Sequence, residues 1–381
     1  MKEKYYIVVL PGDGIGTEVC QHALHILEII QQTMNIPFEF ETIPCGGAYY
    51  LEHEEEWPPG SFEKCKAADA ILLGAVGHQV DGKDVFTKPG KPYDIPQLAG
   101  YAQVIGNRKK LNLYANVRPI KLYPNVPQNI AGHFVHLFSP NDVDYVIVRE
   151  NTEGAYSGKT YPITNENGEE VGKYTPIHIT KKATEQIVRF AFQLAQKRNK
   201  QKKVTCVDKS NIIGAHQYFR EIFTQIGKEE FPHIQTDFAY FDAFCQWQMR
   251  NPENFDVVVA PNLVGDVISD NGAITAGGLG FAAGANIGEH HAMFEPIHGS
   301  APKYAGLDKA NPCAAILAST MMLTWLSEKF QDERLQTASI KIEQALTYVC
   351  QEGKIRTPDM GGNHKGSELA HAIAKQLQQL L

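Results

Sequence analysis

The sequence lacks the features that mark several large classes of protein. Its seven cysteines are widely spread over 381 residues, and no CxxC pair occurs. A disulfide framework or a structural zinc site is therefore not expected. The first apolar run, YYIVVL at residues 5–10, is far shorter than the roughly 18 residues of a membrane span, and no run of that length occurs elsewhere. We therefore expect a cytoplasmic protein without a membrane partner.

Positive charge is also scarce. The net charge is −7 at pH 7, and RNKQKK at 198–203 is the longest basic run, so no nucleic-acid partner is expected. Apolar residues make up 43% and charged residues 21% of the chain, which is typical of a globular protein. The length exceeds what one simple core usually holds and predicts two domains.

The glycines of LPGDGIG at 10–16 fall short of a dinucleotide-binding fingerprint. In G-x-G-x-x-G the third glycine would stand where the chain has Thr17. No acid other than Glu41 ends a second strand at the spacing needed to bind a ribose. The sequence therefore predicts a fold other than the Rossmann fold.

Strand-like and helix-like segments alternate along the chain, which predicts an α/β protein. Apolar β-prone runs indicate the strands, and they are at 5–10, 38–47, 70–77, 145–150, 203–210 and 255–262. Apolar residues at helical spacing indicate helices at 17–33, with Thr17 as a candidate N-cap, at 310–330 and at 333–350. The stretch 78–97 is rich in Pro, Gly, Asp and Lys and is expected to be an exposed loop.

Residues 153–180 differ from their surroundings. They are rich in Gly, Thr, Tyr and Pro, and NENGEE forms a turn between two β-prone runs. This pattern predicts a hairpin, and an isolated two-stranded ribbon needs a surface to pack on. That surface is either a second subunit or the hairpin's own domain.

Two acids in PNLVGDVISDNG suggest a metal site. Asp266 and Asp270 are four residues apart, so on a helix they share one face. A hard divalent cation such as Mg²⁺ or Mn²⁺ would relieve their repulsion, and Asp242 in AYFDAF offers a third carboxylate. The alternative is a pair of solvated acids near a helix start.

Other residues suggest the chemistry of an anionic substrate. Arg108, Arg118 and Arg149 could together bind a dicarboxylate or tricarboxylate, or each could make a structural ion pair. Lys209, which follows a buried strand, is either a proton carrier or a surface lysine. Tyr156 is either a proton donor or a packed aromatic ring. The loop FEPIHGSAPKYAGLDKANP at 294–312 can bring backbone close to a flat polar ligand.

Six ordered motifs connect these residues. LPGDGIG, ANVRP, VIVRENTEG.Y, DKSN, FDVVV.PNL.GD..SD and EPIHGSAP.YAG resemble the β-decarboxylating dehydrogenases, which include isocitrate, 3-isopropylmalate, homoisocitrate and tartrate dehydrogenases. The resemblance runs from residue 6 to about 372.

The resemblance implies two α/β domains with a cleft between them. The large domain on the cofactor side would comprise 1–112 with 273–381, and the small dimerisation domain 113–272. Residues 153–180 match the family's intersubunit arm, so the resemblance favours a homodimer with shared active sites, or a tetramer.

The resemblance also implies the reaction and its residues. A 2-hydroxy acid with a carboxylate on C3 is oxidised at C2, loses CO₂, and its enol is protonated. Asp266 and Asp270 of one subunit and Asp242 of its neighbour would bind Mg²⁺ or Mn²⁺. Lys209 of the neighbour, through its contact with Asp242, resembles the base, and Tyr156 resembles the acid. The remaining matches are Arg108, Arg118 and Arg149 for the malate carboxylates, Asn211 beside the nicotinamide, and, at the adenosine end, Ile15, His298, Gly299, Ser300, Ala301, Pro302, Lys303, Tyr304 and Asn311.

The cofactor preference rests on Lys303 and Tyr304. NAD-dependent members commonly carry Asp-Ile there, whereas this pair resembles NADP-dependent isocitrate dehydrogenases, and a lysine should favour a 2′-phosphate. Bacterial NADP enzymes add a later Tyr and Arg, where this chain has TPDMGG at 357–362. We therefore favour NADP over NAD.

The substrate preference rests on the residues before Arg108. Isocitrate enzymes usually have Ser at the position six residues before this arginine, and often Asn at the position four residues before it. Here these positions are Ala102 and Val104, and Ile105 follows. An apolar pair resembles the 3-isopropylmalate pattern, although QVIGNR departs from the usual leucine-rich run. We therefore expect 3-isopropylmalate or a close apolar analogue, with isocitrate, homoisocitrate, tartrate or D-malate as alternatives. A silent regulatory subunit would be expected to lose Lys209, Tyr156 or an aspartate, all of which are present.

Overall fold

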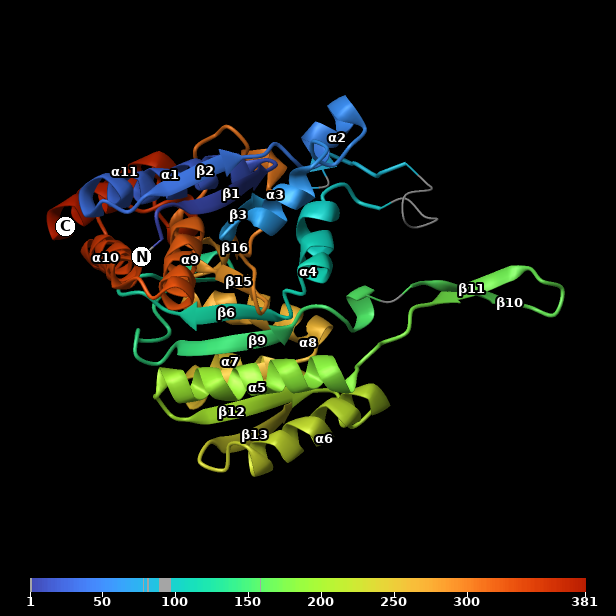
Figure 1. Ribbon diagram of the computed structural model, residues 1–381. Coiled ribbons are helices and arrows are strands. Elements are labelled where there is room, and N and C mark those ends of the chain that lie inside the picture. The colour runs from blue at the N-terminus through green and yellow to red at the C-terminus, as the bar shows by residue number, and fades with distance from the viewer. Residues whose placement is uncertain (1, 78, 81, 89–96, 158) are drawn as a thin grey trace. The chain divides into compact units, whose positions relative to one another are not determined.

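The computed structural model describes residues 2–77, 79–80, 82–88, 97–157 and 159–381. The chain divides into two compact units (Figure 1). Unit 1 comprises Met1–Leu113, Lys121–Pro140 and Ala273–Leu381, and unit 2 comprises Tyr114–Ile120 and Asn141–Gly272. Strands and helices alternate in both units, so the predicted α/β class is confirmed.

The sheet of unit 1 has the strand order β15-β16-β3-β1-β2. The strands are β1 (Tyr5–Gly12), β2 (Phe38–Thr42), β3 (Ala70–Ala75), β15 (Ala283–Ile287) and β16 (Ala292–Pro296). Strand β1 is parallel to β2 and β3, and β16 is parallel to β3, but β15 runs antiparallel to β16. This mixed sheet differs from the all-parallel Rossmann sheet, in agreement with the sequence prediction.

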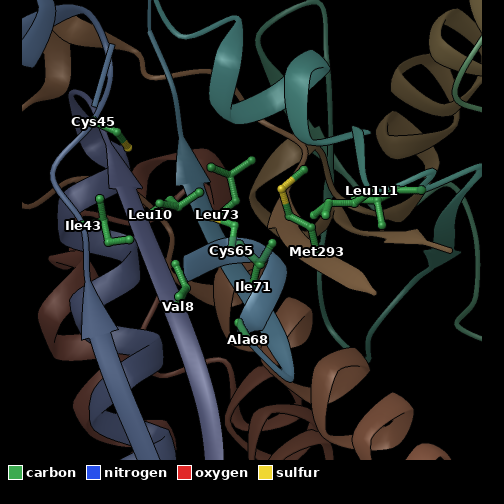
Figure 2. Close-up of a cluster of buried hydrophobic side chains, with 11 residues drawn as sticks. Val8, Leu10, Ile43, Cys45, Cys65, Ala68, Ile71, Leu73, Leu111 and Met293 are labelled. Atoms are coloured by element: carbon green, nitrogen blue, oxygen red, sulfur yellow. The ribbon is translucent and has the colours of Figure 1, made fainter. Parts of the chain in front are cut away.

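Apolar runs explain why these strands are central. Val8 and Leu10 of β1 and Ile71 and Leu73 of β3 are buried in one cluster with Met293 of β16, as Figure 2 shows. Because helices cover both faces of such a sheet, its strands are nearly continuous in apolar residues.

Four long helices belong to unit 1. They are α1 (Ile15–Met34), α9 (Cys313–Phe330), α10 (Glu333–Glu352) and α11 (Gly366–Leu380). The prediction that Thr17 caps the first helix is wrong: the helix begins after Gly14 without a side-chain cap, and the Thr17 hydroxyl donates to the Gly14 carbonyl at 3.0 Å. Thr17 therefore lies within the first helical turn, where its hydroxyl bonds backward along the chain.

Shorter elements complete unit 1. They are α2 (Gly47–His53), α3 (Ser61–Ala67), the π-helical turn η1 (Ala102–Gly106), α4 (Asn107–Lys110), β4 (Gln79–Val80), β5 (Lys83–Asp84), β7 (Gln128–Ile130) and β8 (His133–Val135). Of the expected loop at 78–97, residues 78, 81 and 89–96 lie outside the described residues. In the described part, Val85 is buried in a small cluster with Tyr50, so full exposure was a wrong prediction there.

The sheet of unit 2 has the strand order β13-β12-β14-β9-β6. The strands are β6 (Ala115–Lys121), β9 (Asp144–Glu150), β12 (Lys203–Asp208), β13 (Gln235–Tyr240) and β14 (Val257–Ala260). The pairs β13–β12, β12–β14 and β14–β9 are all parallel, so the carboxyl ends of these strands lie at one edge of the sheet. The helices are α5 (Lys181–Arg198), α6 (Gly214–Glu229), α7 (Phe241–Arg250) and α8 (Asn262–Ala273).

A two-stranded ribbon also belongs to unit 2. Strands β10 (Tyr161–Thr164) and β11 (Glu170–Tyr174) pair in antiparallel fashion (Figure 1). The rings of Tyr161 and Tyr174 stack with their centres 5.3 Å apart. The hairpin predicted within 153–180 is confirmed, and its pairing with a second subunit stays a prediction. None of the helices in the described part of the chain has the length and apolarity that crossing a membrane requires.

Candidate active site

Arg149 is the last residue but one of strand β9 and is almost fully buried in unit 2. Its Nε and Nη2 donate to the Asn262 side-chain oxygen at 3.1 and 2.7 Å, and its Nη1 donates to Asp266. Helix α8, which carries both acceptors, approaches closely because Gly265 has no side chain: a Cβ there would lie 2.6 Å from the Arg149 Cβ. Arg149 is thus fixed against the start of α8.

Arg118, on strand β6, reaches the same helix from another strand. Its Nε donates to the side-chain oxygen of Asn116 at 2.6 Å, and its Nη1 donates to the Ser269 hydroxyl at 2.6 Å. The same Nη1 lies 3.2 Å from Asp266 Oδ1 and 3.3 Å from Asp270 Oδ1. Two of the three arginines predicted to bind carboxylates, Arg118 and Arg149, therefore contact predicted metal ligands.

Tyr156 belongs to this cluster as well. Its hydroxyl donates to Asp266 Oδ2 at 2.9 Å, and the Arg149 guanidinium lies 5.4 Å from the centre of its ring. Burial raises the pKa of Tyr156, and the charge of Asp266 and the hydrogen bond to it raise it further. The phenol is therefore held as a proton-bearing donor at the cluster.

The cluster of Arg118, Arg149, Asp266 and Asp270 carries formally balanced charge. Burial raises the pKa of Asp270, Arg118 opposes this, and the charge of Asp266 adds to the rise. A divalent cation would relieve that repulsion, and carboxylate oxygens suit Mg²⁺ or Mn²⁺. A dianionic substrate added with the cation would leave the charge balance unchanged. The two carboxylates therefore fit such a metal, but the described residues of one chain contain no group of three or more acidic, His or Cys side chains placed to hold it.

Asp242, the third predicted ligand, lies with Lys209 instead. The Lys209 Nζ donates to Asp242 Oδ1 at 2.5 Å, and this hydrogen bond is the main reason that the pKa of Asp242 is lowered. Lys209 follows the end of β12, and Asp242 follows the end of the parallel neighbour β13. The structure thus brings together the predicted base and the carboxylate through which it would act. Asn211 is exposed in the turn after β12.

Arg108 lies in unit 1 and has a different environment. Its Nη2 donates to Glu295 Oε1 at 2.8 Å, and the Asn286 amide donates to the same oxygen at 2.8 Å. The structural ion pair considered for Arg108 is therefore present. Its buried Nε has no hydrogen-bond partner in the part of the chain that the structure describes.

The turn η1 carries the predicted specificity residues. Its Gln103 and the following Asn107 are fully buried, and the Gln103 amide donates to the backbone carbonyl of Glu56 at 2.5 Å. Val104 is half-buried and packs on the core cluster of unit 1, whereas Ile105, also half-buried, is not part of that cluster.

A cavity of about 430 Å³ in unit 1 contains several of the predicted cofactor residues. Those lining it are Ile15, His298, Ala301, Tyr304 and Asn311; Gly299, Ser300, Pro302 and Lys303 do not line it. Burial lowers the pKa of His298, so the ring is neutral, and its Nε2 has no hydrogen-bond partner within the described ranges. A mainly apolar cavity with one unpaired ring nitrogen fits the adenosine end of a dinucleotide.

The glycine loop serves contacts within the protein. Gly14 has φ +57°, and a Cβ on it would lie 2.1 Å from the carbonyl oxygen of Ser300. The neighbouring Ile15 amide donates to that same carbonyl at 2.8 Å, which holds Ile15 at the cavity. The buried carboxylate of Asp13 accepts from the amides of Gly47, Ala48 and Gly77, each at 2.9 Å.

Several supporting residues were not identified from the sequence. They are Asp13, Asn116, Asn262, Ser269 and Glu295. The sequence did contain an indication of Asn116. Residues two apart on a strand share a face, which places Asn116 beside Arg118. A signal also existed on α8, where Asn262, Asp266, Ser269 and Asp270 repeat at helical spacing. Asp13 and Glu295 have no local signal, since their partners are distant in sequence.

These observations describe an α/β protein with a cluster of arginines and carboxylates in unit 2 and a mainly apolar cavity in unit 1. The family model of the isocitrate/isopropylmalate dehydrogenases matches residues 6–373, so the chain belongs to this family, as its motifs predicted. Its members are NAD(P)- and divalent-metal-dependent decarboxylating dehydrogenases that act on the CH–OH group of small hydroxy acids.

Individual relatives agree over nearly the whole chain. A 3-isopropylmalate/3-methylmalate dehydrogenase from Methanocaldococcus jannaschii is 39% identical, over 98% of this chain and 99% of its own. A decarboxylating D-malate dehydrogenase from Escherichia coli is 34% identical, over 98% of this chain and 99% of its own. Among solved structures, an isocitrate dehydrogenase from Methylococcus capsulatus has a TM-score of 0.83 and 32% identity, covering 98% of this chain and 100% of its own.

Proposed function

We propose that this chain catalyses the metal- and NAD(P)-dependent oxidative decarboxylation of a 3-substituted (2R,3S)-malate, with 3-isopropylmalate or a close apolar analogue as the substrate. The identity to a relative named for 3-isopropylmalate and 3-methylmalate supports the substrate class.

One observation in turn η1 carries the substrate proposal. The polar side chains of this segment, Gln103 and Asn107, are fully buried, whereas Ala102, Val104 and Ile105 are half-buried and apolar. The segment thus offers no polar side chain to a third carboxylate on the substrate. Burying a carboxylate against valine and isoleucine would cost several kcal/mol, because the charge would lose its contact with water. A branched alkyl group carries no charge and would not have this cost.

The charged cluster of unit 2 performs the binding and the proton transfers. Arg118 and Arg149 bind the malate carboxylates, as we propose for Arg108 of unit 1. When bound by Asp266, Asp270 and the partner's equivalent of Asp242, a divalent cation would polarise the substrate 2-hydroxyl. Lys209 contacts Asp242 within one chain, so the partner that supplies Asp242 also supplies Lys209, whose Nζ takes the hydroxyl proton. Tyr156 returns a proton to the enol carbon from its hydroxyl, which Asp266 holds in place.

We propose NADP as the preferred cofactor. Bound nicotinamide would accept the hydride from C2, with Asn211 beside the ring. Tyr304 lines the cavity of unit 1 and Lys303 is exposed next to it, so the lysine is available to a 2′-phosphate. The cavity also contains Lys309, a second cation near the same end.

A specific feature favours an isocitrate or homoisocitrate dehydrogenase as the second candidate, because the Lys303–Tyr304 pair resembles NADP-dependent isocitrate enzymes. The D-malate relative keeps D-malate and tartrate as further alternatives.

The assembly and location are also proposals. We propose a cytoplasmic homodimer, or a tetramer, in which the ribbon at 153–180 is the intersubunit arm and the active sites are shared. The residues of unit 1 and unit 2 would then correspond to the large and small domains of the family. The support is that the described residues of one chain offer no third acidic, His or Cys side chain placed with Asp266 and Asp270 to hold a metal.

A substrate panel with both cofactors tests the proposal. The purified enzyme with Mn²⁺ is assayed with 3-isopropylmalate, isocitrate, homoisocitrate, tartrate and D-malate, each with NAD and NADP. We expect the highest kcat/KM for 3-isopropylmalate with NADP. An isocitrate lead of about tenfold, which is about 1.4 kcal/mol, would show that the apolar-pocket argument is wrong. Equal use of NAD and NADP would remove the charge argument for Lys303.

A further inference from the structure

The Lys209–Asp242 pair is built from two separate chain segments. Lys209 follows the last residue of β12, and Asp242 lies in the first turn of α7, two residues after the end of β13. Both side chains are partly exposed, with 28% and 67% of their surfaces accessible. An exposed ion pair between flexible side chains gains little by itself. Its geometry must therefore come from what holds the two strand ends.

Arg220 of helix α6 holds the end of β12. Its Nε donates to Asp208 Oδ2 at 2.7 Å, and its Nη2 donates to Asp208 Oδ1 at 2.9 Å. Asp208 is fully buried and directly precedes Lys209. This two-pronged contact fixes both the position and the rotation of the carboxylate.

The carboxylate in turn orders the backbone around Lys209. Asp208 Oδ1 also accepts from the Ser210 amide at 2.8 Å. The Lys209 amide donates to His216 Nδ1 at 3.0 Å, and burial lowers the pKa of His216, so its ring is neutral and can accept. The turn that carries Lys209 is therefore bonded on both sides of the lysine.

The same guanidinium also holds the end of β13. It lies 5.1 Å from the ring centres of both Phe238 and Tyr240. Tyr240 is the last residue of β13 and sits immediately before the helix that carries Asp242. Arg220 is thus the side chain that contacts both strand ends, one by charge-assisted hydrogen bonds and the other by cation–π contact.

We propose that Arg220 is a positioning residue for proton transfer, which sets the distance and direction between Lys209 Nζ and the Asp242 carboxylate. The inference rests on the proposed function in one respect, since it takes Lys209 to be the base. A lysine in its place would keep the charge but lose the planar fork and most of the ring stacking. Misplacing a proton-transfer group by about 1 Å can cost about 100-fold in rate.

The kinetic test compares Arg220→Gln and Arg220→Lys with a matched control. The control, Arg189→Gln, breaks another arginine–carboxylate fork of unit 2. Arg189 lies on the surface of α5, away from the strand ends, and donates to Glu230 at 2.8 to 3.1 Å. We expect Arg220→Gln to lower kcat by about 10- to 100-fold. The KM for substrate should change by less than about threefold, because Arg118 and Arg149 are untouched. Arg220→Lys should recover part of kcat, and Arg189→Gln should leave kcat unchanged.

A double-mutant cycle separates positioning from general destabilisation. If Arg220 acts through Lys209, adding Arg220→Gln to Lys209→Met should lower the residual rate no further. An equal fold-loss in both backgrounds would overturn the inference. So would a drop in the fraction of folded enzyme that accounts for the whole rate loss.

A spectroscopic measurement tests the positioning without turnover. Lysines are reductively methylated with ¹³C, and the Lys209 signal is identified by its loss in Lys209→Arg. We expect this signal to shift or broaden in Arg220→Gln and to stay in place in Arg189→Gln; an unchanged signal would overturn the inference. Full activity of Lys209→Met would instead refute the proposed base while the NMR result still decides the role of Arg220.

Discussion

The charged cluster of unit 2 and the cavity of unit 1 are built from different kinds of contact. In unit 2 the functional groups are charged side chains that contact one another, as Arg118 and Arg149 contact Asp266. In unit 1 the cavity is mainly apolar, although Lys309 and Asp359 also line it, and the glycine loop is held by the Ser300 carbonyl and the Asp13 carboxylate. The cluster depends on charge balance and the glycine loop on close backbone approach.

This difference predicts how each should fail. A buried charge that loses its partner destabilises the site by far more than the intact pair stabilises it. Single substitutions in the charged cluster of unit 2 should therefore lower kcat strongly. The glycine loop of unit 1 depends on close backbone contacts. Added volume in this loop should therefore lower stability and cofactor binding more than an altered charge there would.

The largest effect is expected for Asp266→Asn. Asparagine keeps the shape and can still accept from Tyr156, but it removes the charge that balances Arg118 and Arg149, both at most 5% exposed, and it removes a proposed metal ligand. We expect kcat to fall by about 100- to 1,000-fold, by analogy with the loss of other preorganised electrostatic contacts. Initial rates and Mn²⁺ binding measured by titration check this.

The matched control is Asp237→Asn on β13. This carboxylate is 48% exposed and 3.9 Å from Lys203, so it forms only a long, partly exposed ion pair. Its loss should change kcat by less than about twofold. Comparable losses in both variants would show that unit 2 is sensitive to charge in general and that the cluster is not special.

An intermediate effect is expected for Gly14→Ala in unit 1. The added methyl would lie 2.1 Å from the Ser300 carbonyl oxygen at a residue with φ +57°, so the loop or the Ser300 segment must move. Ile15 would then leave the cavity wall. We expect a loss of about 2–3 kcal/mol in unfolding free energy and a higher KM for the cofactor, with less change in the KM for substrate. Urea unfolding and steady-state kinetics measure these.

Gly60→Ala is the control for backbone strain. Gly60 has φ +83°, yet nothing lies within 4 Å of a Cβ built on it. The substitution should therefore cost only the positive-φ penalty of about 1 kcal/mol and leave the cofactor KM unchanged. If the two variants behave alike, the close approach of Gly14 to Ser300 has no role of its own.

The same contrast explains what the sequence could predict. The residue types that carry charge chemistry, such as Asp266, Asp270 and Lys209, are visible in the sequence, and the apolar runs that form β1 and β3 indicated the α/β fold. Each of these signals lies within one short segment. Side-chain chemistry is thus readable where its partners are on the same helix face or strand.

Contacts between distant segments could not be predicted in this way. Gly14 meets Ser300 almost 300 residues later, and Arg220 contacts two strands from a helix that shows only an amphipathic pattern. The glycines looked like a ligand loop, but their freedom is used for contacts within the protein. Only the three-dimensional arrangement relates such residues, because no residue type marks a backbone partner.

The smallest effect on activity is expected at Asp332, a buried carboxylate of unit 1 that does not line the cavity. Asp332 is buried and caps helix α10; Arg334 Nη2 donates to it at 2.7 Å and the Tyr5 hydroxyl at 2.8 Å. Hydrogen bonding to Arg334 is the main reason that its pKa is lowered to about 2. Because the folded state holds the carboxylate ionised, its stabilisation is present above the unfolded pKa of about 4 and is lost as the pH falls towards about 2.

Asp332→Asn should therefore destabilise the enzyme by about 2 kcal/mol at pH 7 without changing kcat, since Asp332 does not line the cofactor cavity. The difference in unfolding free energy between wild type and variant should shrink as the pH is lowered from about 5 to about 3. Urea unfolding at several pH values, with kinetics at pH 7, measures both. A changed kcat would mean that a buried charge of unit 1 outside the proposed binding residues also affects catalysis, and the contrast between the two units would not hold.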